Sequence, residues 1–215
     1  GIPEGQYAIA QIMDQSLYFR IDKLSLVFSY VFILVTFIGV IYALHVKESG
    51  EHTAAFVYAG SALGVVSAGD LISLFIFWEI LTIAALFIIW LNKTKAAQKA
   101  AMRYALVHFF GGVSLLSGII LHVAETGSTA FGYIGVDGLS SWLILLGVVI
   151  NVAVVPFHAW LPDAYPEASV TGTVFLSVFT TKAAVYVLAR AFPGAEILII
   201  AGVVMAVYPI FFAVL

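Results

Sequence analysis

Seven stretches of this chain approach the length that a membrane-spanning helix needs. About 20 predominantly apolar residues are required to cross the hydrocarbon core of a bilayer as a helix. The stretches cover approximately residues 24–44, 54–70, 71–92, 103–123, 138–161, 168–190 and 196–215. This pattern predicts an all-α integral membrane protein with about seven transmembrane helices.

The composition agrees with this class and excludes several others. Hydrophobic residues make up 63% of the 215 residues and charged residues only 10%, whereas about a quarter of the residues of a soluble protein are charged. There is no cysteine, which excludes disulfides, thiolate metal sites and iron–sulfur clusters. The short loops and a net charge of −3 offer no nucleic-acid surface. We expect no cofactor, metal or nucleic acid.

The segments outside these stretches have distinct characters. Residues 1–23 are mixed polar and aromatic, and "LYFRID" (Leu17 to Asp22) favours β structure, so we expect an ordered extramembrane segment there. Only Gly69 and Asp70 separate the second and third stretches. These two stretches are therefore expected to form a tight helical hairpin.

Basic residues near the helix ends predict the orientation in the membrane. The loop "NKTKAAQKAAMR" holds Lys93, Lys95, Lys99 and Arg103 without any acid, and such loops stay in the cytoplasm. Residues 45–53 and 162–168 are then cytoplasmic, and 1–23, Asp70, 124–137 and 193–194 are external. We expect the cytoplasmic membrane of a bacterium or archaeon.

Two ionisable side chains lie deep in the predicted helices. Glu79 is nine residues after Asp70, and Lys182 is eight residues before Arg190, so at about 1.5 Å per residue both are far from the helix ends. A charge at a helix centre costs about 2.5–3.5 kcal/mol on insertion scales. They either form a buried pair that locks two helices together or belong to an ion pathway, and these interpretations are not exclusive.

A proline and an asparagine interrupt the fifth stretch. Asn151 lies in its middle, and Pro156 removes a backbone donor and frees the carbonyl of Val152, which predicts a kink or break around Val152–Pro156. Non-helical backbone at membrane depth survives only inside protein or beside water. The pattern predicts a hydrated interior between the third, fifth and sixth stretches.

Two histidines titrate near neutral pH in water and are candidates for the same pathway. His108 lies just inside the basic loop and alternatively faces the membrane interface. His158, in "PFHAW", alternatively caps local backbone. Trp90, Trp142 and Trp160 lie toward the ends of their stretches, where tryptophan is typical of interfacial anchors.

Three blocks of residues carry a resemblance to a known family. "FWEI" (Phe77 to Ile80) following "GDLISLF", then "VVPFHAWLPDAYPEA" and "TTKAAVYVLAR", resemble the antiporter-like subunits of respiratory complex I (chain M type) and Mrp-type sodium/proton antiporters (D subunit type). The likeness spans essentially the whole chain. It implies subunits of about fourteen helices, with two inverted five-helix repeats that each contain a broken helix.

The resemblance also implies roles for single residues. Glu79 matches a glutamate that controls the protonation of a lysine across the helix bundle, and Lys182 matches a lysine that passes protons toward the subunit centre. His158 falls at the cytoplasmic end of the broken helix and His108 near the water path by which protons come in. At Asn151 the family usually has the lysine that partners the glutamate.

The resemblance implies a proton- or sodium/proton-translocating subunit of a multisubunit membrane complex. That complex would be an NADH-quinone oxidoreductase or a cation/proton antiporter, with other membrane subunits, the bilayer, protons and possible sodium ions as partners and no catalytic site in this chain. The alternative is a non-conducting membrane scaffold or accessory subunit, which Asn151 favours. Residues 24–215 are expected to form one half-module, either a fragment of a longer subunit or a half that another chain completes.

Overall fold

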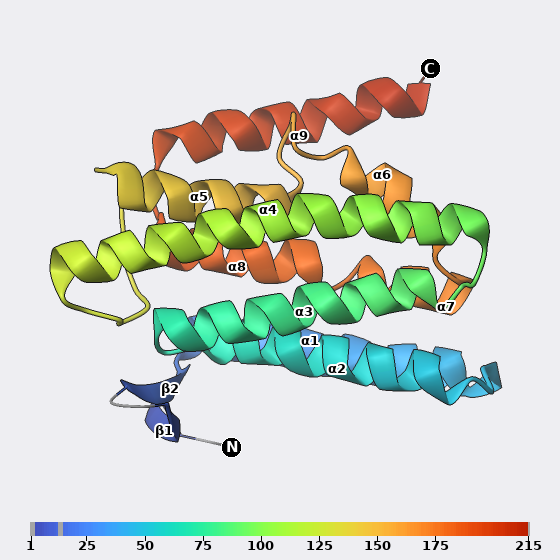
Figure 1. Cartoon of the computed structure of the whole chain (residues 1–215), viewed down its shortest axis with the longest axis horizontal. Helices are drawn as coiled ribbons and strands as arrows, with labels where there is room; N and C mark the ends of the chain where they lie inside the picture. Colours follow the sequence, from blue (N-terminus) through green and yellow to red (C-terminus); the bar gives the residue numbers. More distant parts are fainter. Residues whose placement is uncertain (1–2, 13–14, 215) are drawn as a thin grey trace.

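The computed structural model describes residues 3–12 and 15–214 and shows a bundle of roughly lengthwise helices with a small sheet at one end (Figure 1). The sheet has two antiparallel strands, β1 (Gly5–Ile12) and β2 (Gln15–Ile21). Tyr7 pairs with Phe19, and the register shifts between Ala8 and Ala10. The β structure expected for "LYFRID" is confirmed.

The first three helices are α1 (Lys23–Tyr42), which continues into the 3-10 turn η1 (Ala43–His45), α2 (Ser49–Ser67) and α3 (Leu71–Trp90). The expected hairpin between α2 and α3 is confirmed. Asp70 is the N-cap of α3, because its carboxylate accepts a hydrogen bond from the backbone N–H of Ser73 at 2.7 Å. It also accepts one from the backbone N–H of Tyr18 at 2.7 Å. One carboxylate thus caps a helix and fixes β2 against its end.

Two helices pack closely because glycines lie between them. α4 (Lys95–Thr126) is the longest helix described, and α5 (Leu139–Val152) runs beside it (Figure 1). A β-carbon at Gly147 of α5 would lie 2.7 Å from the carbonyl oxygen of Gly111 in α4. Larger residues at this contact would force the backbones apart.

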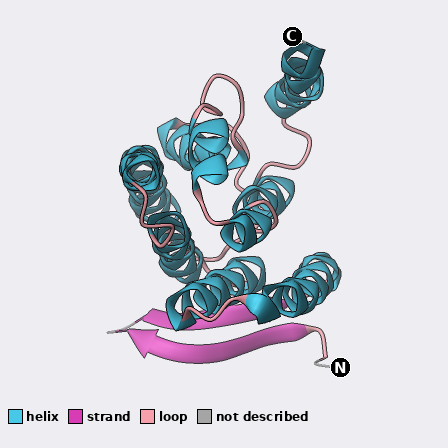
Figure 2. Ribbon diagram, turned by 90° about the vertical axis from the view of Figure 1, so that its right-hand side faces the viewer, coloured by secondary structure: helices cyan, strands magenta, loops and turns pink. Residues whose placement is uncertain are grey.

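The remaining chain forms short helices and one peripheral helix. These are α6 (Trp160–Ala164), η2 (Tyr165–Glu167), α7 (Val170–Leu176), α8 (Thr180–Ala191) and α9 (Glu196–Val214). The break predicted at Val152–Pro156 is confirmed, because α5 ends at Val152. The stretch 168–190, expected to cross as one helix, is divided at residues 177–179. Figure 2 shows α9 standing apart from the other helices.

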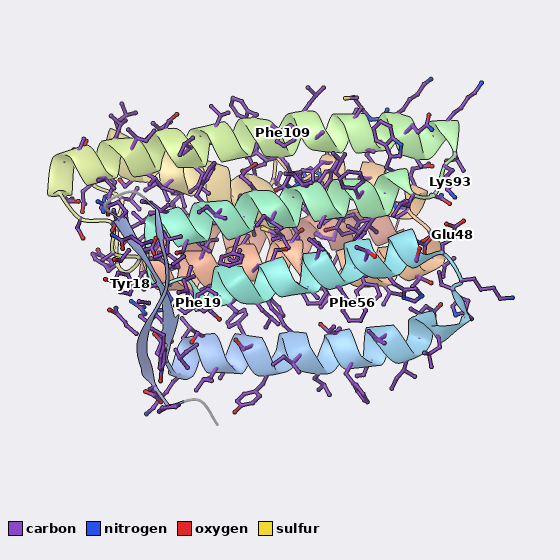
Figure 3. All side chains as sticks on the ribbon, turned by 60° about the horizontal axis from the view of Figure 1, so that its bottom comes forward. Tyr18, Phe19, Glu48, Phe56, Lys93 and Phe109 are labelled. Atoms are coloured by element: carbon purple, nitrogen blue, oxygen red, sulfur yellow. The ribbon has the colours of Figure 1, made fainter. Side chains whose placement is uncertain are left out.

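The integral membrane fold is confirmed, and the expected seven crossings are confirmed in part. Within the described ranges, four helical segments are long and apolar enough to span a membrane: Lys23–His45, α3, α4 and Val170–Ala191. α5 and Glu196–Ile210 are apolar but shorter. Large apolar side chains such as Phe56 and Phe109 point outward, as a lipid-facing surface requires (Figure 3).

The loops that join the long helices lie at two opposite ends of the bundle (Figure 1). At one end Lys93 pairs with Glu48 at 3.0 Å, and Arg103 makes two hydrogen bonds of 2.6 Å to Asp163 (Figure 3). The loops that we expect on the cytoplasmic side therefore do lie together. Which side of the membrane they face stays a prediction.

The opposite end carries a half-buried ion pair beside the sheet. Arg190 of α8 donates two hydrogen bonds of 2.8 Å to Asp22, which also caps α1. Arg20 of β2 contacts the same carboxylate at 3.1 Å and donates to the carbonyl of Phe131 at 2.9 Å. These contacts tie the strands, α1 and α8 together at the end that we expect to be external.

Candidate functional site

A set of polar side chains lies inside the bundle, between the two helix breaks. Its members come from α2, α3, α4, α5, η2 and α8 and are buried, except for Glu79, which is half-buried. They are Tyr58, Glu79, Tyr104, His108, Asn151, Tyr165 and Thr180, called the polar core below. Most of these side chains also interact electrostatically or by hydrogen bonding with another member.

Glu79 projects from the middle of α3 against α4. A β-carbon at Gly112 would overlap the Oε1 atom of its carboxylate, so the glycine makes the room that the carboxylate occupies. This oxygen is buried and has no hydrogen-bond partner within the described residues. Because buried polar atoms are normally hydrogen-bonded, the site suits an internal water molecule or a proton on the carboxylate.

His108 lies one turn before Gly112 on α4 and is fully buried. Its ring stacks on Tyr104, with 3.9 Å between ring centroids, and meets the edge of Trp160 at 4.4 Å. The side chain of Asn151 lies close enough to interact with this ring. The alternative of an interfacial His108 is therefore wrong, and Asn151, at 3% exposure, shares its environment.

The first break, between α5 and α6, is closed by an aromatic donor. Ala153 ends α5 in the left-handed conformation, with φ of 64°. Trp160 then donates its indole N–H to the carbonyl oxygen of Ile150 at 2.9 Å. Trp160 is only 3% exposed, so the prediction of an interfacial anchor is wrong at this position, whereas Trp90 and Trp142 are well exposed.

The second break, between α7 and α8, is closed by a hydroxyl and an ammonium group. The hydroxyl of Tyr58 lies 2.6 Å from that of Thr180, accepts from the Thr180 backbone N–H at 3.1 Å, and lies 3.4 Å from the carbonyl oxygen of Leu176. Lys182 donates to the carbonyl oxygen of Ser177 at 2.6 Å. Ser169 caps α7, because its hydroxyl accepts a hydrogen bond from the backbone N–H of Gly172.

Lys182 and His158 line a cleft of about 720 Å³ between the breaks and α9. The other lining residues are mostly apolar, and they include Phe28 and Val185. The ring of His158 contacts Tyr208, with 4.7 Å between centroids. Its Nδ1 atom has no hydrogen-bond partner in the described part of the chain, so this nitrogen does not cap local backbone.

The two deep charges do not form the buried pair considered above. Among the described residues no ion pair joins Glu79 to Lys182, because the ammonium group is bonded to Ser177 beside the cleft. The structure thus brings His108 and Asn151 together, places Glu79 against Gly112 of the same helix as His108, and places Lys182 with His158 in the lining of the cleft. Among the hydroxyl-bearing side chains of the polar core, Tyr104 stacks on His108 and Tyr58 contacts Thr180 at the second break.

Several members of the polar core were not predicted. Tyr58, Tyr104, Tyr165 and Thr180 belong to otherwise apolar or loop sequence, where a tyrosine or threonine is usually a packing residue. The hydroxyls of Tyr104 and Tyr165 are buried and interact with other members of the polar core, Tyr58 and Thr180 among them. Of these residues, only Tyr104 could have been predicted from the sequence, because it lies one helical turn from His108 and therefore on the same helix face.

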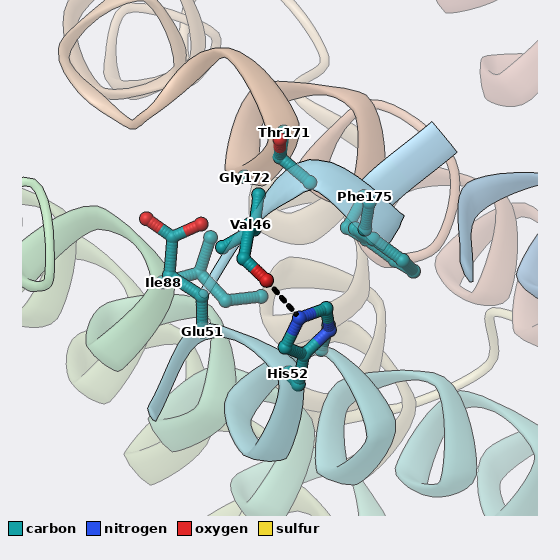
Figure 4. Close-up of a pocket in the computed structure, with 9 residues that line it drawn as sticks. Val46, Glu51, His52, Ile88, Thr171, Gly172 and Phe175 are labelled. Carbon is teal, nitrogen blue, oxygen red and sulfur yellow. Dashed lines mark hydrogen bonds between the residues drawn. The ribbon is translucent and has the colours of Figure 1, made fainter. Parts of the chain in front are cut away.

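A small separate cavity lies at the Glu48–Lys93 end of the bundle (Figure 4). Its volume of about 10 Å³ approaches that of a single water site. His52 lines it and makes a 2.9 Å hydrogen bond with the carbonyl oxygen of Val46, opposite Thr171 and Gly172. Within residues 3–12 and 15–214, no group of three histidine or acidic side chains is placed to hold a metal ion.

Comparison with protein families gives one match over most of the chain. The family described as NADH:quinone oxidoreductase/Mrp antiporter, TM, matches residues 68–215. The Na(+)/H(+) antiporter subunit A1 of Staphylococcus haemolyticus is 31% identical over 84% of this chain and 24% of its own length. NADH-quinone oxidoreductase subunit N of Geobacillus kaustophilus is 32% identical over 67% of this chain and 32% of its own.

Solved structures share the fold. A chain of the Mrp complex from Dietzia sp. DQ12-45-1b has a TM-score of 0.74 at 24% identity, over 83% of this chain and 37% of that one. A chain of the membrane-bound sulfane sulfur reductase, an archaeal respiratory membrane complex, has a TM-score of 0.75 at 24% identity, over 86% and 32%. The chain spans about a quarter to a third of the relatives and structures named above.

Proposed function

The chain belongs to the family of transmembrane subunits shared by NADH:quinone oxidoreductases and Mrp antiporters, and from this premise we propose that it translocates protons within a multisubunit membrane complex. Sodium is the alternative ion, since a carboxylate accepts either. The other membrane subunits of the complex supply the coupling energy. The loop from Lys93 to Arg103 faces the cytoplasm in this proposal.

One observation carries the proposal: a carboxylate and an ammonium group lie at membrane depth without pairing with each other. A purely structural role would favour a direct ion pair, because each isolated charge is costly to bury. Instead Glu79 faces the polar core, and Lys182 faces the cleft. Groups held in this way can gain and lose a proton, which is why ionisable residues inside membranes mark ion pathways.

The polar core supplies a route between the two charges. A proton on Glu79 reaches the layer of His108 and Asn151 on the neighbouring helices. The route continues through hydroxyl groups to the second break, namely those of Tyr104, Tyr165, Tyr58 and Thr180. There Tyr58 and Lys182 donate hydrogen bonds to backbone carbonyl oxygens of the interrupted helix. Lys182 then passes the proton into the cleft, where His158 also lies.

The proposal is tested by removing the carboxylate that begins this route. Glu79→Gln keeps the size and hydrogen-bonding capacity of the side chain but cannot release a proton. In vesicles with the full-length subunit in its assembled complex, proton uptake followed with a pH-sensitive dye should fall by about tenfold or more. Glu48→Gln is the matched control, since Glu48 is an exposed carboxylate at the end of the bundle, and it should transport like the native protein.

A scaffold role is the second candidate, and Asn151 is the observation that favours it. An amide cannot carry a proton as an ion, so a lysine at this position would be the stronger relay. If Glu79→Gln assembles and transports as fast as the native complex, this chain is a non-conducting scaffold. Loss of transport with intact assembly establishes the pathway.

A further inference from the structure

His108 occupies the face of α4 that Glu79 reaches. Glu79 lies against Gly112, and residues four apart on a helix are neighbours on one face, with about 5–6 Å between their β-carbons. His108 precedes Gly112 by four residues. The imidazole of His108 therefore projects from the face of α4 against which the carboxylate of Glu79 lies.

Packing alone does not explain a histidine at this position. The ring is fully buried between Tyr104 and Trp160. The side chain of Asn151 can serve only one of its two nitrogens, so at least one buried nitrogen has no hydrogen-bond partner among the described residues. Leaving buried nitrogens unpaired costs stability, whereas phenylalanine would stack equally well. The unpaired nitrogen instead suits a group that binds reversibly, namely water or a proton.

The other titratable groups facing this region are less suited to exchange with Glu79. Tyr104 and Tyr165 are phenols, which hold their protons far above neutral pH. Lys182 is committed to the carbonyl oxygen of Ser177 and lines the cleft. Of the ionisable side chains described around the polar core, the imidazole is the base that in water changes its charge near neutral pH.

We propose that His108 is the base that exchanges a proton with Glu79, with Asn151 as its positioning partner. In this step the O–H bond of the protonated Glu79 carboxyl breaks and an N–H bond forms on the imidazole, directly or through one water. The products are a carboxylate and an imidazolium. The side chain of Asn151 interacts with the ring, and its amide oxygen can accept a hydrogen bond from the imidazolium. The inference rests on the proposed function and names the residue that takes the proton from Glu79.

The arrangement makes a specific rescue possible. Because the side chain of Asn151 reaches the same region as His108, a lysine in its place would bring a different base to the polar core. His108→Phe should abolish transport, and Asn151→Lys in the same chain should restore it. A structural defect at His108 would not be repaired by adding a charge nearby.

The experiment measures proton uptake by vesicles that contain the full-length subunit in its assembled complex. His108→Phe and His108→Gln should each reduce uptake by about tenfold or more, although both complexes assemble. The variant His108→Phe/Asn151→Lys should regain most of the uptake, with the pH profile moved to higher pH because lysine is the stronger base. His122→Phe, toward the other end of α4, should leave uptake unchanged.

The outcomes separate this inference from the proposed function. If Glu79→Gln loses transport while His108→Phe and His108→Gln keep it, the function stands and His108 is not the base. In a second outcome, both histidine variants lose transport and Asn151→Lys added to His108→Phe restores none of it. This outcome also refutes a proton exchange between His108 and Glu79. Restoration with a shifted pH profile supports it.

Discussion

The two helix breaks solve the same problem with different chemistry. Each one frees backbone carbonyls at membrane depth, where an unsatisfied polar group is costly. At the first break the donor is the indole of Trp160, which bonds to Ile150. At the second break the donors are the ammonium group of Lys182 and the hydroxyl of Tyr58. One break is closed by a group that never ionises, and the other by groups that also belong to the candidate pathway.

Because of this difference, we expect substitutions at the two breaks to have different effects on stability and on transport. Substitution of Trp160 at the first break should mainly lower the free energy of unfolding, because the indole does not ionise and its hydrogen bond goes to the backbone of Ile150. Substitutions at the second break should alter transport as well, because the same side chains hold the backbone and lie on the route. The predictions below test that separation, from the largest expected effect on stability to the smallest.

Trp160→Phe should give the largest loss of stability. The variant leaves the Ile150 carbonyl without its donor and opens space beside Tyr104 and Tyr165. Together these effects should lower the free energy of unfolding by about 2–4 kcal/mol, measured by thermal unfolding of the purified protein in detergent. Trp142→Phe is the control, because Trp142 is well exposed. An equal loss in both variants would contradict the role of the indole.

Tyr58→Phe should have an intermediate effect on stability and should also slow transport. It removes the hydroxyl that bonds to Thr180 at the second break, at a cost of about 1–3 kcal/mol. Tyr186→Phe is a matched control, since the Tyr186 hydroxyl is buried without a partner among the described residues. Its loss should leave stability unchanged or slightly higher. If Tyr58→Phe proves as harmless as Tyr186→Phe, the second break does not depend on this hydroxyl.

Ala153→Gly should produce a small gain in stability. Ala153 has φ of 64° at the end of α5, a conformation that costs an L-residue about 1–2 kcal/mol and glycine nothing. After the greater flexibility of glycine in the unfolded chain is allowed for, the unfolding temperature should rise slightly. Ala159→Gly is the control, because Ala159 has right-handed helical angles. A rise in the control, or a fall in Ala153→Gly, would argue against strain at this turn.

The first break was predictable because the residues that cause it lie within the break itself or next to it in the sequence. Pro156 cannot donate a backbone hydrogen bond, and Asn151 is out of place in an apolar helix. The hairpin at Asp70 and the β structure of residues 17–22 were equally accessible, because capping residues and β-branched or aromatic runs act locally. The main architecture of the membrane fold followed from such signals.

The second break and most of the polar core could not be predicted in the same way. No proline or glycine marks residues 177–179, and the break depends on Tyr58, which is 122 residues from Thr180 in the chain. The partners of Trp160 and His108 are likewise set by packing between distant helices. The sequence pointed to Glu79, Lys182, Asn151 and the two histidines, but it could not show which of them meet.

Proton uptake by the Lys182→Ala complex tests the central claim most directly, that a charge at the second break carries transport. Uptake by vesicles containing the full-length subunit in its assembled complex should be abolished by this variant. It should change more for Asn151→Lys than for Val154→Lys, because Asn151 faces the polar core beside His108. Equal uptake by the native, Lys182→Ala and Asn151→Lys complexes would contradict conduction and leave a scaffold in its place.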